Sequence, residues 1–327
     1  MQDRDEMRAK IHRGAHEIGG NCVELEAEGK RLVLDLGWPL TVPLDADLPA
    51  PDVAGLTQPD PSLLGIVLSH PHLDHYGLLS KVTADVPVYL GEAAHRVLQE
   101  AAFFTGTPGL VREPAGFLHH GKPFAVGPFN ITPLLIDHSA FDSYCLLVEA
   151  EGRRLFYTGD LRDHGRKHGA FEDLLRDPPT NIDVLLMEGT NIHPDGGDLD
   201  RGLSETDVEH ACVETFRATE GIVLACFSPQ NIDRLVTIYR AAIRSGRDLV
   251  LDLYGAAVAA ATGRETIPQA QWERVRVYLP NSQRAKVIKS CEFHRTDAHA
   301  DLVAPVEPVA STRRIRPAIR HWPCSPA

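Results

Sequence analysis

The feature that most constrains this chain is a dense run of histidine and aspartate at the end of an apolar segment. The segment 63–68 (LLGIVL) predicts a short buried strand, and the run 69–77 (SHPHLDHYG) follows it directly. This run has the pattern H-x-H-x-D-H, formed by His70, His72, Asp74 and His75. Imidazole and carboxylate are ligands that suit zinc and, in other geometries, manganese or iron. Four such side chains within six residues exceed what one ion easily uses, so the run indicates two adjacent metal sites.

Two further candidate ligands follow later predicted strands. His138 comes after an apolar pattern at 131–136, and Asp160 follows the run 154–158. A single His or Asp at a strand end is usually structural, but two of them in this order after the first motif indicate one joint site. We therefore expect both side chains to converge with the first motif on one pocket. Asp35 ends a predicted strand at 31–36, where it either orients a metal-bound histidine or makes a plain turn.

Composition places the chain among ordinary globular proteins. Hydrophobic residues make up 43% and charged residues 24% of the 327 residues, which excludes whole-chain disorder, a collagen-like repeat and a disulfide miniprotein. The net charge is −12, so any contact with nucleic acid has to come from a local basic patch. Six scattered cysteines without a C-x-x-C pair fit free thiols in a reducing compartment. Since we find no apolar leader and no apolar run of membrane length, we expect a cytoplasmic protein without a membrane partner.

The apolar pattern divides the chain into three parts. Residues 11–194 alternate strands with helices and loops, which predicts a layered α/β domain. Residues 195–304 predict a smaller α/β domain, with a helix over 204–219, a strand over 221–226, a helix over 231–243 and a strand over 249–253. Strand, helix and strand in this order form a βαβ unit with a parallel sheet. Residues 305–327 lose the apolar periodicity and gather arginines, which predicts an irregular basic tail.

The metal motifs resemble those of the metallo-β-lactamase fold, an αββα sandwich that binds a dinuclear metal centre. The resemblance implies three groups of ligands: His70, His72 and His138 for one ion, Asp74 and His75 for the other, and Asp160 as the bridge. The cofactors implied are two divalent metal ions, zinc first, with manganese and iron as alternatives. The nucleophile implied is a metal-bridging hydroxide, because the ions lower its pKa and polarise the scissile ester.

Three further segments narrow the resemblance to the ribonuclease J-like and other β-CASP nucleases. The run 14–21 (GAHEIGGN) is similar to the E-I-G-x-N start of that group. Glu188, at the end of the apolar run 182–187, matches an acidic residue that ends a strand soon after the bridging aspartate. The segment 225–235 (ACFSPQNIDRL) is similar to the strand-turn-helix of the inserted β-CASP domain. The resemblance covers about residues 11–255 and implies a phosphodiesterase acting on single-stranded RNA, with Asp74 and Glu188 as catalytic residues.

Ser228 and Asn231 lie where this strand-turn-helix would set a strand end against a helix N-terminus, a natural position for a substrate phosphate. Plain capping of the helix explains the same residues equally well. Both interpretations, substrate binding and helix capping, stay open from the sequence.

The chain also departs from the β-CASP pattern. Members of that group return from the inserted domain to the first one and bring two further histidines, one often within S-G-H. No S-G-H occurs here, His294 and His299 stand in runs that do not match, and His321 lies in the basic tail. The resemblance is therefore to a member incomplete at its C-terminus, in which the second metal lacks a ligand. Beside the ribonuclease, two alternatives stay open: a hydrolase of a small ester or thioester, and a catalytically impaired protein that binds metal or nucleic acid. A homodimer is also left open.

Overall fold

The computed structural model describes residues 6–106, 113–190 and 202–297. The predicted basic tail at 305–327, together with His299 and His321, lies outside the described residues. The predicted domain boundary near residue 195 also falls in a stretch that is not described.

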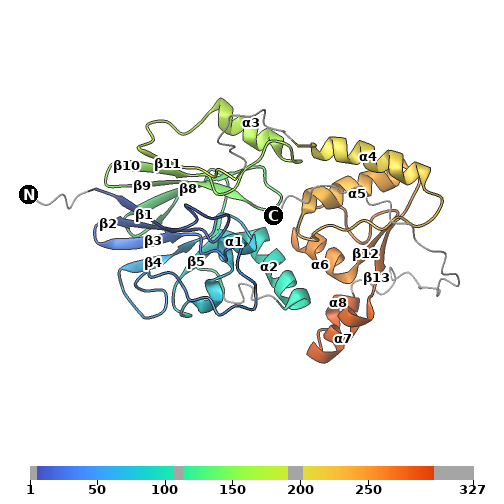
Figure 1. The fold of residues 1–327 in the computed structure, drawn as a ribbon, viewed down its shortest axis with the longest axis horizontal. Helices are drawn as coiled ribbons and strands as arrows, with labels where there is room; N and C mark the ends of the chain where they lie inside the picture. The colour runs from blue at the N-terminus through green and yellow to red at the C-terminus, as the bar shows by residue number, and fades with distance from the viewer. Residues whose placement is uncertain (1–5, 107–112, 191–201, 298–327) are drawn as a thin grey trace, which may run out of the picture.

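A six-stranded sheet forms the first layer of the molecule (Figure 1). Its strands, in spatial order, are β1 (Arg8–Arg13), β2 (Cys22–Ala27), β3 (Lys30–Leu34), β4 (Leu63–Val67), β5 (Val88–Gly91) and β6 (Gly116–Leu118). The first three strands run antiparallel, and β3 to β6 run parallel. The carboxyl ends of β3, β4 and β5 therefore meet at one edge of this sheet, and the histidine-rich run begins there.

A five-stranded sheet forms the second layer and packs face to face on the first (Figure 1). Its strands, in spatial order, are β11 (Val184–Leu186), β10 (Arg153–Tyr157), β9 (Tyr144–Ala150), β8 (Phe129–Leu135) and β7 (Phe124–Val126). Strands β7 to β10 are antiparallel neighbours, and β11 joins β10 in parallel. The strands predicted at 129–135, 144–149 and 154–158 are thus confirmed to within a residue at each end.

Alternation along β3 explains why the two sheets make a sandwich covered by helices. Leu32 and Leu34 point into the apolar core between the sheets, where they contact Phe129 and Ile131 of the second sheet. Val33 points the other way, into a second buried cluster on the outer face of the first sheet. Since both faces are apolar, both need cover, and helices lie on the outer sides (Figure 1). These are α1 (Leu73–Tyr76), a 3₁₀ turn (Leu79–Lys81), α2 (Glu92–Thr105) and α3 (His168–Arg176).

The second unit begins at α4 and lies to one side of the sandwich (Figure 1). Its elements are α4 (Glu205–Ala218), α5 (Ile232–Arg244), β12 (Leu249–Asp252), α6 (Leu253–Ala261), β13 (Val275–Tyr278), α7 (Asn281–Ser290) and α8 (His294–Asp297). Ser204 and Asp207 form a capping box at the start of α4, as expected from a helix predicted to begin at Ser204. β12 and β13 pair in parallel around α6, which makes a βαβ arrangement from other elements than the predicted ones at 221–226, 231–243 and 249–253.

The strand predicted at 221–226 is wrong. Those residues form no strand, and Ile222 and Leu224 are 77% and 80% exposed. Val223 and Phe227 pack against the apolar core of the second unit, whereas the alternate side chains face outward. Among the described residues, β12 pairs only with β13, so the segment 222–227 has no neighbouring strand to complete a ladder. An apolar run predicts a strand, but a strand also needs a hydrogen-bonded partner.

Helices α2 and α6 join the two units. Val97 and Ala101 of α2 pack against Tyr254 and Val258 of α6 in a shared buried cluster. Arg96 Nε also donates to the carbonyl oxygen at the end of α6, Ala261 O, at 2.8 Å. In the described part of the chain, every helix is too short or too polar to traverse a lipid bilayer.

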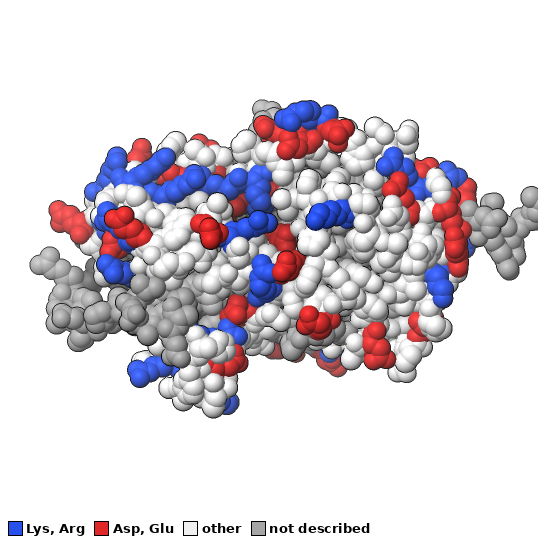
Figure 2. Space-filling model, turned by 180° about the vertical axis from the view of Figure 1, so that it is seen from behind, with Lys and Arg blue, Asp and Glu red and all other residues white. Residues whose placement is uncertain are grey.

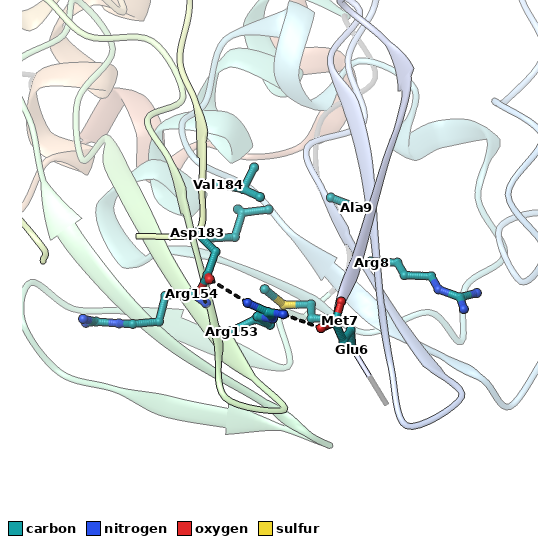
Figure 3. Close-up of a pocket in the computed structure, with 9 residues that line it drawn as sticks. Glu6, Met7, Arg8, Ala9, Arg153, Arg154, Asp183 and Val184 are labelled. Carbon is teal, nitrogen blue, oxygen red and sulfur yellow. Dashed lines mark hydrogen bonds and ion pairs between the residues drawn. The ribbon is translucent and has the colours of Figure 1, made fainter. Parts of the chain in front are cut away.

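A groove of about 200 Å³ lies where β1 approaches β10 and β11. Figure 3 shows the Arg153 side chain between Glu6 and Asp183 on the wall of this groove, with ion pairs to both carboxylates. These pairs connect the segment before β1 with the second sheet. The side chains on the wall of this groove therefore connect the two sheets. None of the candidate ligands lines the groove.

Candidate metal centre

The loop that carries the H-x-H-x-D-H run is held by backbone hydrogen bonds from the strand end beside it. Leu36 N donates to His75 O at 2.8 Å, and Asn21 N donates to Asp74 O at 3.2 Å. Gly37 allows this close approach, because a Cβ built at that position would lie 1.5 Å from Asp74 O. The loop is thus fixed by main-chain contacts that are independent of its ligand side chains.

Three histidines form the first candidate group. His70, His72 and His138 each offer one ring nitrogen, and these atoms all lie within 4.8 Å of one another. His138 Nε2 lies 3.0 Å from His72 Nδ1, and the His70 and His138 ring centroids are 4.5 Å apart. His70 Nε2 is buried and has no hydrogen-bond partner among the described residues. A buried nitrogen without a partner, aimed at two other imidazoles, fits a metal ligand.

The second candidate group shares His70 with the first. It comprises His70, His75 and Asp160. His75 Nε2 lies 3.3 Å from Asp160 Oδ1, and His70 Nε2 lies 3.9 Å from Asp160 Oδ2. Asp74 Oδ2 is 3.7 Å from His75 Nε2, close to this group but outside it. The structure therefore brings all six predicted ligands to one place, at the ends of β4, β8 and β10.

Asp35 organises the buried side of this centre. Its carboxylate is fully buried and accepts hydrogen bonds from Ser69 N, Ser69 Oγ and Tyr157 OH at 2.6–2.7 Å. It also lies 2.7 Å from His75 Nδ1. With Nδ1–H donated to Asp35, the ring is fixed so that the opposite nitrogen, Nε2, faces Asp160. Of the two roles open from the sequence, this geometry is that of an orienting carboxylate.

Sequence reasoning missed three partners of the centre. Ser69 and Tyr157 contact Asp35, and Asn21 Nδ2 lies 3.0 Å from His75 Nε2. Ser69 and Asn21 stand inside quoted motifs, so their positions gave a signal, although their chemistry did not distinguish them from turn residues. Tyr157 gave only the weaker signal of a polar group within a buried strand close to Asp160.

The imidazoles of the first group are poised to be neutral. Burial, reinforced by the neighbouring His75, lowers the pKa of His72 to about 4. Burial and the surrounding histidines also lower the pKa of His70 and His138 well below the ordinary value. A neutral imidazole has a free lone pair, which is the form that binds a metal ion.

The second group has the opposite electrostatics. Burial opposes charge on His75, but the carboxylates of Asp35 and Asp160 prevail and raise the pKa of His75 well above its ordinary value. The same histidine lowers the pKa of Asp160 against the effect of burial. This site therefore favours a positive charge between carboxylates, as a bound cation would supply.

Glu188 supports the loop that carries Asp160. Glu188 Oε1 accepts from Leu161 N at 2.7 Å, and Glu188 N donates to Thr158 Oγ1 at 3.3 Å. Burial raises the pKa of its carboxyl group. It thus contacts residues on both sides of Asp160; its predicted catalytic role stays a prediction.

The predicted substrate-binding pair lies in the second unit, at the start of α5. Asn231 Oδ1 accepts from Arg234 N at 3.0 Å and so caps the helix. Ser228 is exposed, and its carbonyl oxygen accepts from Asn231 N. Capping therefore occupies Asn231, and substrate binding by this pair stays a prediction. His294 is exposed in α8 and belongs to neither candidate group.

Comparison with known proteins identifies the family. A family model described as the beta-lactamase superfamily domain matches residues 31–221, more than half of the chain. The chain belongs to the beta-lactamase superfamily. Within this superfamily, the αββα sandwich with its H-x-H-x-D-H run has the predicted metallo-β-lactamase fold.

Curated relatives confirm the predicted likeness to ribonuclease J. The chain is 29% identical over 245 residues to "Ribonuclease J" of Mycobacterium tuberculosis (strain ATCC 25618 / H37Rv), covering 72% of this chain and 42% of that protein. It is 26% identical over 246 residues to "Ribonuclease J" of Helicobacter pylori (strain ATCC 700392 / 26695), covering 73% and 35%. The chain thus spans less than half the length of these relatives. A solved structure of a protein of unknown function from Enterococcus faecalis V583 shares the fold, with a TM-score of 0.67, 22% identity, and coverage of 84% of this chain and 69% of that one.

Proposed function

We propose that this superfamily member is a dinuclear-metal-dependent phosphodiesterase that cleaves RNA. The observation that carries the proposal is the pair of adjacent ligand groups that share His70. The superfamily and the ribonuclease J relatives support the more general assignment, that the chain is a hydrolase. The dinuclear centre, the RNA substrate and the individual roles of the residues belong to the proposal.

The residues present fit two divalent ions, with zinc as the first choice and manganese or iron as alternatives. His70, His72 and His138 would hold one ion; Asp74, His75 and Asp160 would hold the other. Such ions, when bound, supply Lewis acidity and a water of lowered pKa. The chain's own part is to hold this donor set in place: Asp35 fixes the His75 ring with Nε2 toward the centre, and Glu188 fixes the loop next to Asp160.

RNA as substrate has support beyond the names of the relatives. An acidic chain needs a local basic surface to attract a polyanion. Figure 2 shows Lys and Arg side chains in a band toward the upper left of the rear view, where α4 and α5 lie. A groove of about 380 Å³ on these helices is lined by Arg217, Arg244 and His210, together with Val213 and Glu214. Arg240 and Arg244 of α5 each expose about half of their side chain. This band is where we propose that the RNA backbone lies.

The division of the chain and its location are part of the same proposal. We infer a metal-binding domain over 11–194 and a β-CASP-like domain over 195–304. The five cysteines in the described residues are free, which agrees with a reducing compartment such as the cytoplasm. A homodimer stays a prediction.

The test combines metal content with turnover. Purified protein is analysed for bound metal and offered 5′-phosphorylated single-stranded RNA beside small ester and thioester substrates. We expect two ions per chain and RNA cleavage, and loss of cleavage by several orders of magnitude in His72→Ala and Asp74→Ala. His168→Ala, at an exposed histidine of α3, is the matched control and should cleave normally.

The other outcomes identify the alternatives. Ester or thioester turnover without RNA cleavage would support the small-substrate hydrolase. Metal bound without turnover would support the catalytically impaired binding protein. A wild-type chain that binds no metal would overturn the proposal.

A further inference from the structure

The segment 162–167, which follows Asp160, lies against the backbone of the ligand His138. Lys167 Nζ donates to His138 O at 3.0 Å. In the preceding peptide, on the other side of His138, Arg162 N donates to Asp137 O at 2.9 Å. Gly165 N donates to the Asp137 carboxylate at 2.7 Å. The Lys167 ammonium and the Arg162 backbone amide therefore hold the main chain on both sides of His138, and Gly165 N holds the side chain of the residue before it.

A single carboxylate from the second unit holds this segment. Asp233 of α5 is 4% exposed and forms an ion pair with the Arg162 guanidinium. The oxygen that pairs with Arg162, Oδ2, also accepts from Arg166 N at 3.0 Å, and the other oxygen, Oδ1, lies 3.5 Å from Lys167 Nζ. The Arg166 guanidinium forms an ion pair with Glu209 of α4, with 2.6 Å between a guanidinium nitrogen and Glu209 Oε2. The contact between the metal-binding loop and the second unit is thus a buried network of charges with Asp233 at its centre.

Removing the charge of Asp233 would take from Arg162 and Lys167 a carboxylate that both contact, and leave Arg162 with the longer contact to Asp137, 3.6 Å. An uncompensated buried charge is costly, so the loop would rearrange toward water. Unbalanced positive charge near His138 would also repel a divalent cation. Both effects act on the same group of ligands, His70, His72 and His138.

We propose that Asp233 is a positioning residue for the metal centre: by holding Arg162 and Lys167 it fixes His138, and it thereby couples α5 of the second unit to metal affinity. The inference rests on the metal centre of the proposed function. Asp233 does not touch the ions or the substrate. It acts through the main chain of a ligand, as partners outside the coordination sphere commonly do.

The experiment measures zinc affinity of the full chain by competition with a chromophoric chelator, for the wild type and for Asp233→Asn. We expect one of two ions to bind about 10-fold or more weakly in the variant. The matched control is Asp163→Asn, an Asp in the same segment whose side chain is about half exposed; it should bind both ions as the wild type does. Asp233→Glu, which keeps the charge, should recover part of the affinity.

A second readout separates positioning from general loss of structure. Cobalt(II) replaces zinc, and its visible absorption reports the geometry of the donors. We expect an altered cobalt spectrum in Asp233→Asn and an unaltered one in Asp163→Asn. If Asp233→Asn does not fold, Lys167→Met carries the test, since it removes the donor to His138 O and leaves Asp233 paired with Arg162.

Zinc affinity and a cobalt spectrum equal to those of the wild type, in a folded Asp233→Asn or in Lys167→Met, would overturn the proposal. The failure of the proposed function looks different, because it shows in the wild type itself, as absence of bound metal or as absence of RNA cleavage.

Discussion

The sandwich and the second unit differ in how they bury their apolar segments. In the sandwich, each sheet contributes one face to a shared core, and helices or loops cover the outer faces. In the second unit, the described residues give only a two-stranded sheet, and the apolar segment 222–227 keeps one side open. The candidate ligands lie at strand ends of the first region, where paired strands define each position. The second region contacts the segment after Asp160 through Asp233 of α5, which pairs with Arg162 and Lys167.

The largest difference in stability between the two regions is expected from a glycine substitution in each. Gly37→Ala would push a methyl group into Asp74 O, so we expect a loss of about 4 kcal/mol or more in the free energy of unfolding. Gly221→Ala, where an added Cβ meets nothing within 4 Å, should change it by less than about 0.5 kcal/mol. Denaturant unfolding of both variants measures the difference. If Gly37→Ala and Gly221→Ala unfold with equal free energy, Gly37 and Asp74 O are not in close contact in solution.

A leucine in each region gives the next largest effect. Leu25 is fully buried between the sheets, and Leu25→Ala should cost about 3 kcal/mol of unfolding free energy. Leu224 is 80% exposed, and Leu224→Ala should cost less than about 0.5 kcal/mol. Thermal and denaturant unfolding test this pair. If Leu224→Ala costs as much as Leu25→Ala, the segment 222–227 is covered in solution, and sedimentation would show whether a second copy covers it.

The pH dependence of stability gives the smallest effect and concerns the metal-binding region alone. The pKa of His72 is about 4 in the folded chain, below the value of about 6.5 in an unfolded one, so the unfolded state takes up more protons in acid. Stability is thus lost as the pH falls. Between pH 7 and pH 5 this histidine should cost on the order of 2 kcal/mol in metal-free protein. His75, with its raised pKa, shifts stability in the opposite direction over this interval.

The measurement compares denaturant unfolding at pH 7 and pH 5, with a chelator present, in the wild type and in His72→Asn. From pH 7 to pH 5, His72→Asn should lose less unfolding free energy than the wild type, by about 2 kcal/mol. His168→Asn, at an exposed histidine, should show the wild-type slope. A His72→Asn slope that matches the wild type would contradict the lowered pKa.

The sequence predicted the metal centre better than it predicted the second unit, and the reason is physical. His138 and Asp160 follow strands whose carboxyl ends lie near the loop after β4, so a ligand type and a strand end together located each side chain. The segment 221–226 offered only an apolar run, which is compatible with a strand but does not supply the partner that a strand requires. Contacts such as that between Asp233 and Lys167 join residues 66 positions apart, and no local pattern encodes them.

The sharing of His70 between the two ligand groups has a consequence for the order in which the centre fills. Nδ1 of this ring lies 3.0 Å from Ser69 Oγ, which leaves Nε2 as the nitrogen that faces the centre. One nitrogen can complete the coordination of one ion only. An ion that takes His70 together with His72 and His138 leaves its neighbour with His75 and the carboxylates. The two occupancies are therefore unequal and interdependent, so titration should pass through a half-loaded species before both positions fill.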